Sequence, residues 1–229
     1  MNRHAGDIIK EYLREGKLAA NRSTPIGAGS YGTVYESDIP GRVMKQSHQA
    51  DVGGLMEKEA NLQAIAAEMG IAPRVTSLET FPAGIGNRIE MKDIRTNYEP
   101  VTGEGFPNDP MINLRTAQQL GQLALKGVRL EDRRAANIMR HKMTGRPMQL
   151  DFGIADKMDK SQSAAWLSHV TAEGFDAAGL GGIGDVLRAT VYDLLEGGDV
   201  NDAMDVARQG YTRLLNIKKP LDNSVNLLA

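Results

Sequence analysis

The sequence contains no cysteine, which excludes disulfide bridges, thiolate metal sites and a cysteine nucleophile. It also lacks a long apolar run. The opening MNRHAGDIIKEYLREGK is interrupted by charge every few positions, and no later stretch approaches the length of a membrane-spanning helix. We therefore expect a soluble cytoplasmic protein with no membrane partner.

An excess of positive charge is missing as well. The chain has 27 Lys and Arg against 29 Asp and Glu, a formal net charge of -2, so no overall basic field favours nucleic acid as a partner. What is present is a chain of 229 residues, 41% hydrophobic and 24% charged. That composition is typical of a globular protein that buries one sizeable core or two small lobes.

The first part of the chain reads as mainly β. After a predicted amphipathic helix at residues 4–20, glycines alternate with valines between Thr24 and Lys45, which predicts antiparallel strands joined by tight turns. Residues 54–69 have apolar positions near helical spacing and are followed by a stop signal at Gly70. Two further strands are predicted in RVTSLETF and NRIEMKDI.

The second part reads as mainly helical. NYEPVTGEGFPNDP is rich in Pro and Gly and predicts a loop between lobes. A short β-type interval follows the first of the helices, which are predicted at roughly 113–127, 161–172, 180–196 and 200–215. The order predicts an α+β chain of two unequal lobes. We divide it into an N-terminal helical extension (1–22), an N-lobe (23–94), a C-lobe (95–216) and a tail (217–229).

A glycine-rich segment lies between two of the predicted strands. Gly27, Gly29 and Gly32 are spaced so that backbone amides can approach phosphate oxygens where a Cβ would interfere. The strand-like flanks disfavour a dinucleotide-binding fingerprint, which needs a helix opening at the last glycine. An ordinary glycine-rich hairpin is the alternative.

Lys45 follows two apolar residues at the end of a predicted strand. A lysine buried on such a strand needs a carboxylate or phosphate partner. Glu59 on the following helix is the expected carboxylate, and Glu57 on the same helix is the competitor. Solvated surface charges remain the alternative for all of them.

Two acids and an amide recur at short spacing further on. Asp132 precedes Asn137 by five residues, and Asp151 ends a short predicted strand before Phe152 and Gly153. Brought together by neighbouring strands, these side chains could supply a base and oxygen ligands for Mg²⁺, whose partners are often phosphates.

In order and spacing these motifs resemble the protein kinase superfamily from about Thr24 to Asp156. The resemblance implies a bilobal kinase-like fold, with a β-rich N-lobe holding one main helix and a reduced α-helical C-lobe. It implies ATP with Mg²⁺, or Mn²⁺ in its place, as cofactors. Lys45 would contact the α and β phosphates, Glu59 would orient that lysine, and Asp132 would be the catalytic base.

The same resemblance assigns the remaining nucleotide and metal contacts. Asn137 and Asp151 would be the metal ligands. The helix and turn around Glu-Ala-Asn-Leu and Gly-Ile-Ala-Pro resemble small atypical and bacterial kinases, which favours Glu59 over Glu57. The phosphate-covering loop would comprise Gly27, Ala28, Gly29, Ser30, Tyr31, Gly32 and Val34. Met91 would be the gatekeeper, and Lys92, Asp93 and Ile94 the hinge that receives adenine.

Departures from the family pattern narrow the activity. The usual His-Arg-Asp is Leu130-Glu131-Asp132, so the arginine that clamps a phosphorylated activation loop is absent. Arg134 stands where serine/threonine kinases usually have lysine and small-molecule kinases commonly have histidine. We therefore expect phosphoryl transfer to a protein substrate, with Ser/Thr favoured over Tyr. The alternatives are a pseudokinase or binding module, a small-molecule kinase and a nucleotidyl transferase.

Overall fold

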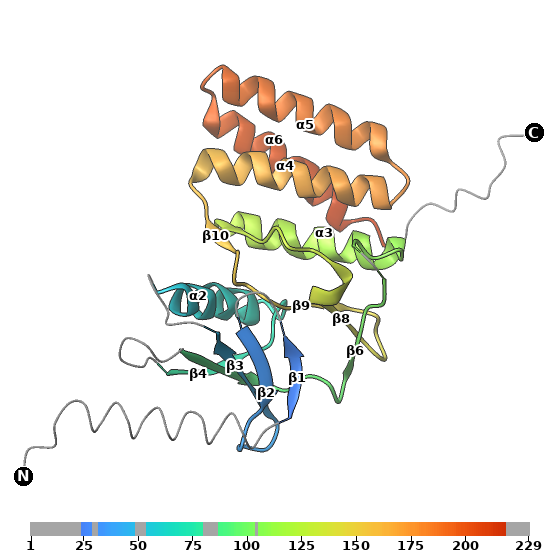
Figure 1. The fold of residues 1–229 in the computed structure, drawn as a ribbon. Helices are drawn as coiled ribbons and strands as arrows, with labels where there is room; N and C mark the ends of the chain where they lie inside the picture. Colours follow the sequence, from blue (N-terminus) through green and yellow to red (C-terminus); the bar gives the residue numbers. More distant parts are fainter. Residues whose placement is uncertain (1–23, 29–31, 49–53, 80–86, 104, 219–229) are drawn as a thin grey trace, which may run out of the picture. The chain divides into compact units, whose positions relative to one another are not determined.

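A computed structural model describes residues 24–28, 32–48, 54–79, 87–103 and 105–218. The chain divides into two compact units, Met1–Thr96 and Asn97–Ala229 (Figure 1). The fold is mixed α+β, as predicted, with an antiparallel sheet in the first unit and most helices in the second. The helix expected within residues 1–22 and the tail from residue 219 lie outside the described residues.

In its described residues, the first unit is a five-stranded antiparallel sheet with one helix. The strands run in the order β1-β2-β3-β5-β4, and every neighbouring pair is antiparallel. The predicted strands and the helix are confirmed. Their bounds are β1 Pro25–Ala28, β2 Gly32–Glu36, β3 Arg42–Ser47, α2 Leu55–Glu68, β4 Val75–Glu79 and β5 Arg88–Lys92.

Helix α2 ends where the sequence predicted it would. Gly70 has φ 67°, the left-handed conformation that glycine adopts without strain, and the Ile71 amide donates back to the Ala66 carbonyl at 2.9 Å. The buried face of the helix packs against the sheet in a small core of Val43, Met56, Ala60, Ile89 and Met91.

The second unit combines short strands with four helices. One sheet has the order β6-β8-β9, and β7 pairs with β10. The segment NYEPVTGEGFPNDP was expected to be a loop throughout, and this prediction is wrong for its residues Tyr98–Pro100. These three residues form β6 and pair with β8. The bounds are β6 Tyr98–Pro100, α3 Pro110–Leu125, β7 Val128–Arg129, the 3-10 helix η1 Ala135–Asn137, β8 Ile138–His141, β9 Pro147–Gln149, β10 Asp156–Lys157, α4 Lys160–Ala177, α5 Gly181–Glu196 and α6 Val200–Leu215.

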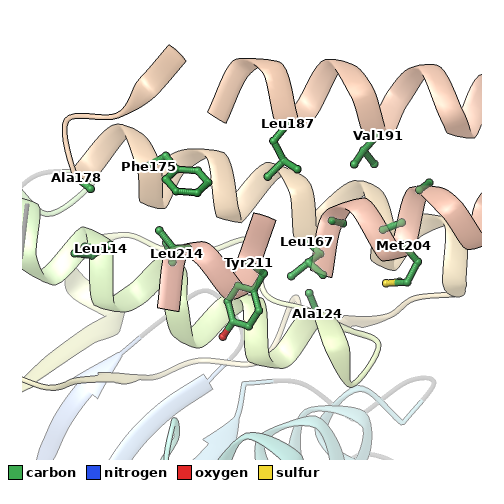
Figure 2. Packing of buried hydrophobic residues seen from close by; sticks show 14 residues of the cluster. Leu114, Ala124, Leu167, Phe175, Ala178, Leu187, Val191, Met204, Tyr211 and Leu214 are labelled. Carbon is green, nitrogen blue, oxygen red and sulfur yellow. The ribbon is translucent and has the colours of Figure 1, made fainter. Parts of the chain in front are cut away.

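The four helices pack around a shared core of buried hydrophobic side chains (Figure 2). Glycines let them approach closely where they cross. A Cβ on Gly121 of α3 would lie 2.1 Å from Cε2 of Tyr211 on α6, and one on Gly174 of α4 would lie 2.6 Å from Cδ2 of Leu214. The Tyr211 hydroxyl donates to the Gln118 carbonyl at 2.5 Å, which satisfies its buried polar end. In the part of the chain that the structure describes, no helix has the length and apolar character needed to cross a membrane.

Candidate active site

Lys45 and Glu59 form a buried ion pair in the first unit. Side chains alternate along β3, so Lys45 lies on the same face as buried Val43, and α2 covers that face. The Lys45 Nζ lies 2.5 Å from Glu59 Oε1, and the two side chains are only 8% and 3% exposed. Glu57 is exposed on the same helix. Of the two candidate carboxylates, Glu59 is therefore the partner.

The glycine-rich segment is described only at its two ends. Gly27 and Ala28 are exposed at the end of β1, Gly32 begins β2, and residues 29–31 lie outside the described ranges. A Cβ on Gly32 would lie 2.6 Å from the Gln46 carbonyl oxygen, so strand pairing alone requires glycine there. A Cβ on Gly27 would meet nothing within 4 Å. Strand packing therefore does not explain the glycine at position 27.

The expected gatekeeper and hinge, residues 91–94, comprise the last two residues of β5 and the two that follow it. Met91 is buried in the core of the first unit. The amides of Lys92 and Asp93 each donate to a backbone carbonyl of that unit at 2.9 Å, which leaves neither for a ligand. The Ile94 amide makes no hydrogen bond to any described residue, so it is the one amide here that could contact adenine.

Asp132 and Arg134 form a bidentate ion pair in the second unit. Arg134 Nε and Nη2 donate to the two carboxylate oxygens of Asp132 at 2.7 and 2.6 Å. The Asp132 side chain is 16% exposed and that of Arg134 is 63% exposed. The hydrogen bond from Arg134, and then its charge, hold the pKa of Asp132 below its usual range. The candidate base therefore stays ionised.

Asn137 lies beside Asp132, and Asp151 of the same unit is near enough to Arg134 for their charges to interact. The Leu150 amide donates to the Asn137 carbonyl at 2.8 Å, which ties the end of η1 to the residue before Asp151. The Asn137 side-chain amide lies 3.4 Å from the Asp132 carbonyl. Asp151 has φ 55°, and its Oδ1 accepts from the Gly153 amide at 3.2 Å. A left-handed backbone at a non-glycine residue stores strain, and such residues cluster at functional sites.

The side chains of Asn137 and Asp151 fit a magnesium ion. The Asn137 NH₂ group is turned toward the Asp132 carbonyl, so its amide oxygen is the atom of this side chain that could bind a cation. Carboxylate and amide oxygens suit Mg²⁺, which is commonly held by one or two protein ligands and completed by phosphates and water. Within the described ranges no cluster of three or more His, Asp or Glu forms a ready-made metal cage. The donor set therefore fits an ion that arrives with a nucleotide.

Sequence reasoning missed Arg133, which directly follows Asp132. Its guanidinium forms an ion pair with Glu173 of α4 and lies 5.4 Å from the Phe106 ring centre and 5.5 Å from that of Trp166. The side chain is mostly buried. The only signal in the sequence was its place directly after Asp132.

No protein-family model matches the chain, and no curated protein matches it either. The positions and chemistry of these residues therefore carry the functional proposal.

Proposed function

We propose that this chain is a phosphotransferase of the protein kinase type, which uses ATP and Mg²⁺ to phosphorylate a protein hydroxyl, with serine or threonine favoured over tyrosine. The buried ion pair of Lys45 and Glu59 is the observation that carries this proposal. Removing two charges from water costs several kcal/mol per ion, and apolar residues of similar volume often serve stability as well or better. A strand lysine whose side chain is held in one position by a buried carboxylate is suited to bind phosphate oxygens.

The two units also have the composition that such a fold requires. The first is an antiparallel sheet with one helix, and the second is mainly helical. We propose that they are the N-lobe and the reduced C-lobe of a kinase-like fold. The glycine-rich segment from Gly27 to Gly32 would then cover the phosphates.

Each charged side chain has one role in the proposed reaction. Lys45 holds the α and β phosphates, and Glu59 fixes the lysine. Asn137 and Asp151 hold Mg²⁺, which screens the phosphate charge when bound. Because catalysis of phosphoryl transfer is mainly alignment and charge compensation, these groups need only be well placed.

Asp132 and Arg134 would serve the acceptor side. The bond from the γ phosphorus to the ADP oxygen breaks, a bond to the acceptor hydroxyl oxygen forms, and the hydroxyl proton passes to the Asp132 carboxylate. The low pKa of Asp132 keeps it in the proton-accepting form. Arg134 is exposed and can turn from Asp132 toward the transferring phosphoryl group.

A binding module without turnover is the second candidate. The observation that favours it is the occupation of both Asp132 oxygens by Arg134. A protein that only bound nucleotide could keep this pair closed, whereas an enzyme must open it to receive a hydroxyl.

The test is phosphoryl transfer from γ-labelled ATP with Mg²⁺ to proteins of a cell lysate, followed by phosphoamino-acid analysis. Glu59→Gln, Asp132→Asn and Asp151→Asn should each lower labelling by at least about 100-fold, the low end of the usual contribution of such groups. Glu57→Gln is the matched control, because it changes an exposed glutamate on the same helix and should leave labelling unchanged.

The results separate the candidates. Label on serine or threonine that disappears in the site variants supports the proposal. ATP binding without ADP release would identify a binding module, and label from α-labelled ATP with release of pyrophosphate would identify nucleotidyl transfer. Either of these would overturn the proposed kinase activity.

A further inference from the structure

A cavity of about 250 Å³ lies within the second unit and is lined in part by Arg133. Helix α3 contributes Thr116, Ala117 and Leu120 to its walls, and α4 contributes Glu173 and Asp176. We call it the Arg133 cavity. None of the proposed nucleotide or metal ligands lines it.

The Arg133 cavity shares a wall with the segment that carries the proposed base. Arg133 directly follows Asp132 in the chain, and its guanidinium stacks over Phe106. The Ala135 amide of η1 donates to the Gly105 carbonyl at 2.7 Å, which fixes the Phe106 wall to this segment. A group bound in the cavity would therefore contact the residue that directly follows Asp132.

Two hydrogen-bond donors at the cavity lack partners. Thr116 is 5% exposed, and neither its Oγ1 nor Arg133 Nε has a hydrogen-bond partner in the described part of the chain. Both residues line the cavity. A buried donor without a partner is unfavourable. Both atoms are covered by protein, so a ligand that brings an acceptor oxygen, such as a peptide carbonyl, would satisfy them only if the two side chains turn toward the cavity.

The rim of the cavity is acidic and its mouth is aromatic. Glu173 is already engaged by Arg133 and by His169, whose Nε2 lies 3.2 Å away. The exposed Asp176 carboxylate makes no ion pair with any described residue, and the Phe106 side chain is 62% exposed. The carboxylate therefore favours a positive charge on whatever binds beside it.

The volume limits the occupant. Pockets for drug-sized ligands and cofactors span about 300–1,000 Å³, so the Arg133 cavity is suited to a smaller group. Most of its deeper walls are apolar, with Ala117, Leu120 and Ile138 all buried. One large apolar side chain would fill such a space.

We infer that the Arg133 cavity binds one large apolar side chain of the protein substrate, aromatic or leucine-like, flanked by a lysine or arginine that faces Asp176. The peptide carbonyl beside that side chain accepts hydrogen bonds from Thr116 and Arg133 when these side chains turn toward the cavity. This inference rests on the proposed function in naming the protein substrate as the occupant. It predicts a substrate preference for an apolar residue next to a basic one.

Trp166 provides a direct test, because it is the only tryptophan of the chain and lies against Arg133. We would titrate the full chain, without ATP, with a capped peptide Ala-Lys-Ala-Lys-Phe-Lys-Ala-Lys-Ala and follow tryptophan fluorescence. A second peptide has alanine in place of phenylalanine, and a third has glutamate in place of every lysine. We expect a saturable change with the first and at least about tenfold weaker binding with the others, the factor that a lost apolar or charged contact of about 1.4 kcal/mol gives.

Matched variants separate binding from folding. Thr116→Val removes the unpartnered hydroxyl, so it should raise the melting temperature of the free protein and yet weaken binding of the first peptide. Thr171→Val is the control, because Thr171 Oγ1 is also buried without a partner but does not line the cavity. It should raise the melting temperature and leave binding unchanged. Asp176→Asn should weaken the binding of the lysine-containing phenylalanine peptide and leave the binding of the glutamate peptide unchanged.

The outcome is independent of catalysis because these peptides contain no hydroxyl. Saturable binding that Thr116→Val weakens supports the inference, whether or not phosphoryl transfer is found. A lack of phosphoryl transfer would overturn the proposed function and leave the inference about the cavity standing. Equal binding of the phenylalanine and alanine peptides, or no fluorescence change while protein phosphorylation proceeds, would overturn the cavity as the docking site.

Discussion

Arg134 reaches back two residues to hold both carboxylate oxygens of Asp132, at 2.7 and 2.6 Å. The arginine is the more exposed partner, so it can leave the pair without any rearrangement of a core. The pair thus keeps the candidate base ionised in the resting protein. It also defines the movement that a substrate hydroxyl must cause before transfer.

The first prediction concerns pH and Arg134. The pKa of Asp132 is lowered in the folded chain, so the pair contributes stability above the ordinary aspartate pKa and loses it as the pH falls through the lowered value. Arg134→Gln should therefore unfold at lower urea concentration than the parent at pH 7, with the difference shrinking toward pH 3. Urea denaturation at both pH values measures this. A difference that grew as the pH fell would contradict the assigned pair.

The second prediction concerns the buried ion pair. Glu59→Gln leaves the Lys45 ammonium buried without its carboxylate, which should cost about 3–5 kcal/mol in the free energy of unfolding. The double variant Lys45→Met with Glu59→Leu should recover most of that loss, because apolar residues of similar volume replace such pairs well. Chemical denaturation measures both variants.

The same double variant separates stability from function. It should fold and yet fail to bind ATP, whereas exposed Glu57→Gln should change neither property. ATP affinity measured by calorimetry on the three proteins decides the matter. Retention of ATP binding in the folded double variant would remove Lys45 from the nucleotide site.

The third prediction contrasts two glycines of one motif. Gly32→Ala places a Cβ 2.6 Å from the Gln46 carbonyl oxygen, so it should lower the free energy of unfolding by about 1–3 kcal/mol. Gly27→Ala meets no atom within 4 Å and should leave stability almost unchanged. If the segment covers phosphates, Gly27→Ala should still weaken ATP binding. Thermal unfolding and a nucleotide titration of both variants give the comparison.

The fourth prediction concerns the helices of the second unit. Gly121→Ala sets a methyl group 2.1 Å from the Tyr211 ring, so the two helices must separate, at a cost of about 1–3 kcal/mol or more. Gly182→Ala on α5 is the control, because its Cβ meets nothing within 4 Å. Adding Tyr211→Leu to Gly121→Ala should destabilise less than the two single changes summed, which a double-mutant cycle in urea measures.

Local signals were enough for many elements of this fold. The helix at residues 54–69 was predicted from apolar spacing and the stop at Gly70, and α2 occupies nearly that range. Helices α5 and α6 also match the predicted 180–196 and 200–215 closely. Their apolar spacing, together with the glycines that follow α2 and α5, was enough to locate them without any distant contact.

Distant contacts decided what the sequence did not predict. β6 contains a proline and only three residues, and it is a strand because β8, some forty positions later, pairs with it. Helix α4 was expected to end near residue 172, but it continues through Gly174, where packing against Leu214 makes glycine useful within a helix. Local propensity is a weak guide wherever tertiary packing sets the residue.

The candidate site divides in the same way. The resemblance favoured Glu59 over Glu57 as the partner of Lys45. The structure decides the choice, because Glu59 is buried beside Lys45 and Glu57 is exposed. Arg133 carried no signal beyond its place next to Asp132. Its role depends on Glu173 and Phe106, which come from α4 and from the segment before α3. Sequence alone does not bring these three together.

The buried ion pair also constrains how this chain can evolve. A substitution of Lys45 or Glu59 alone leaves the other charge buried without its partner and lowers the stability of the fold. Replacing both residues at once by apolar residues costs little stability. A descendant that no longer used ATP would therefore drift first at exposed positions such as Gly27 and Arg134. Lys45 and Glu59 would then stay unchanged in the sequence after the activity itself had been lost.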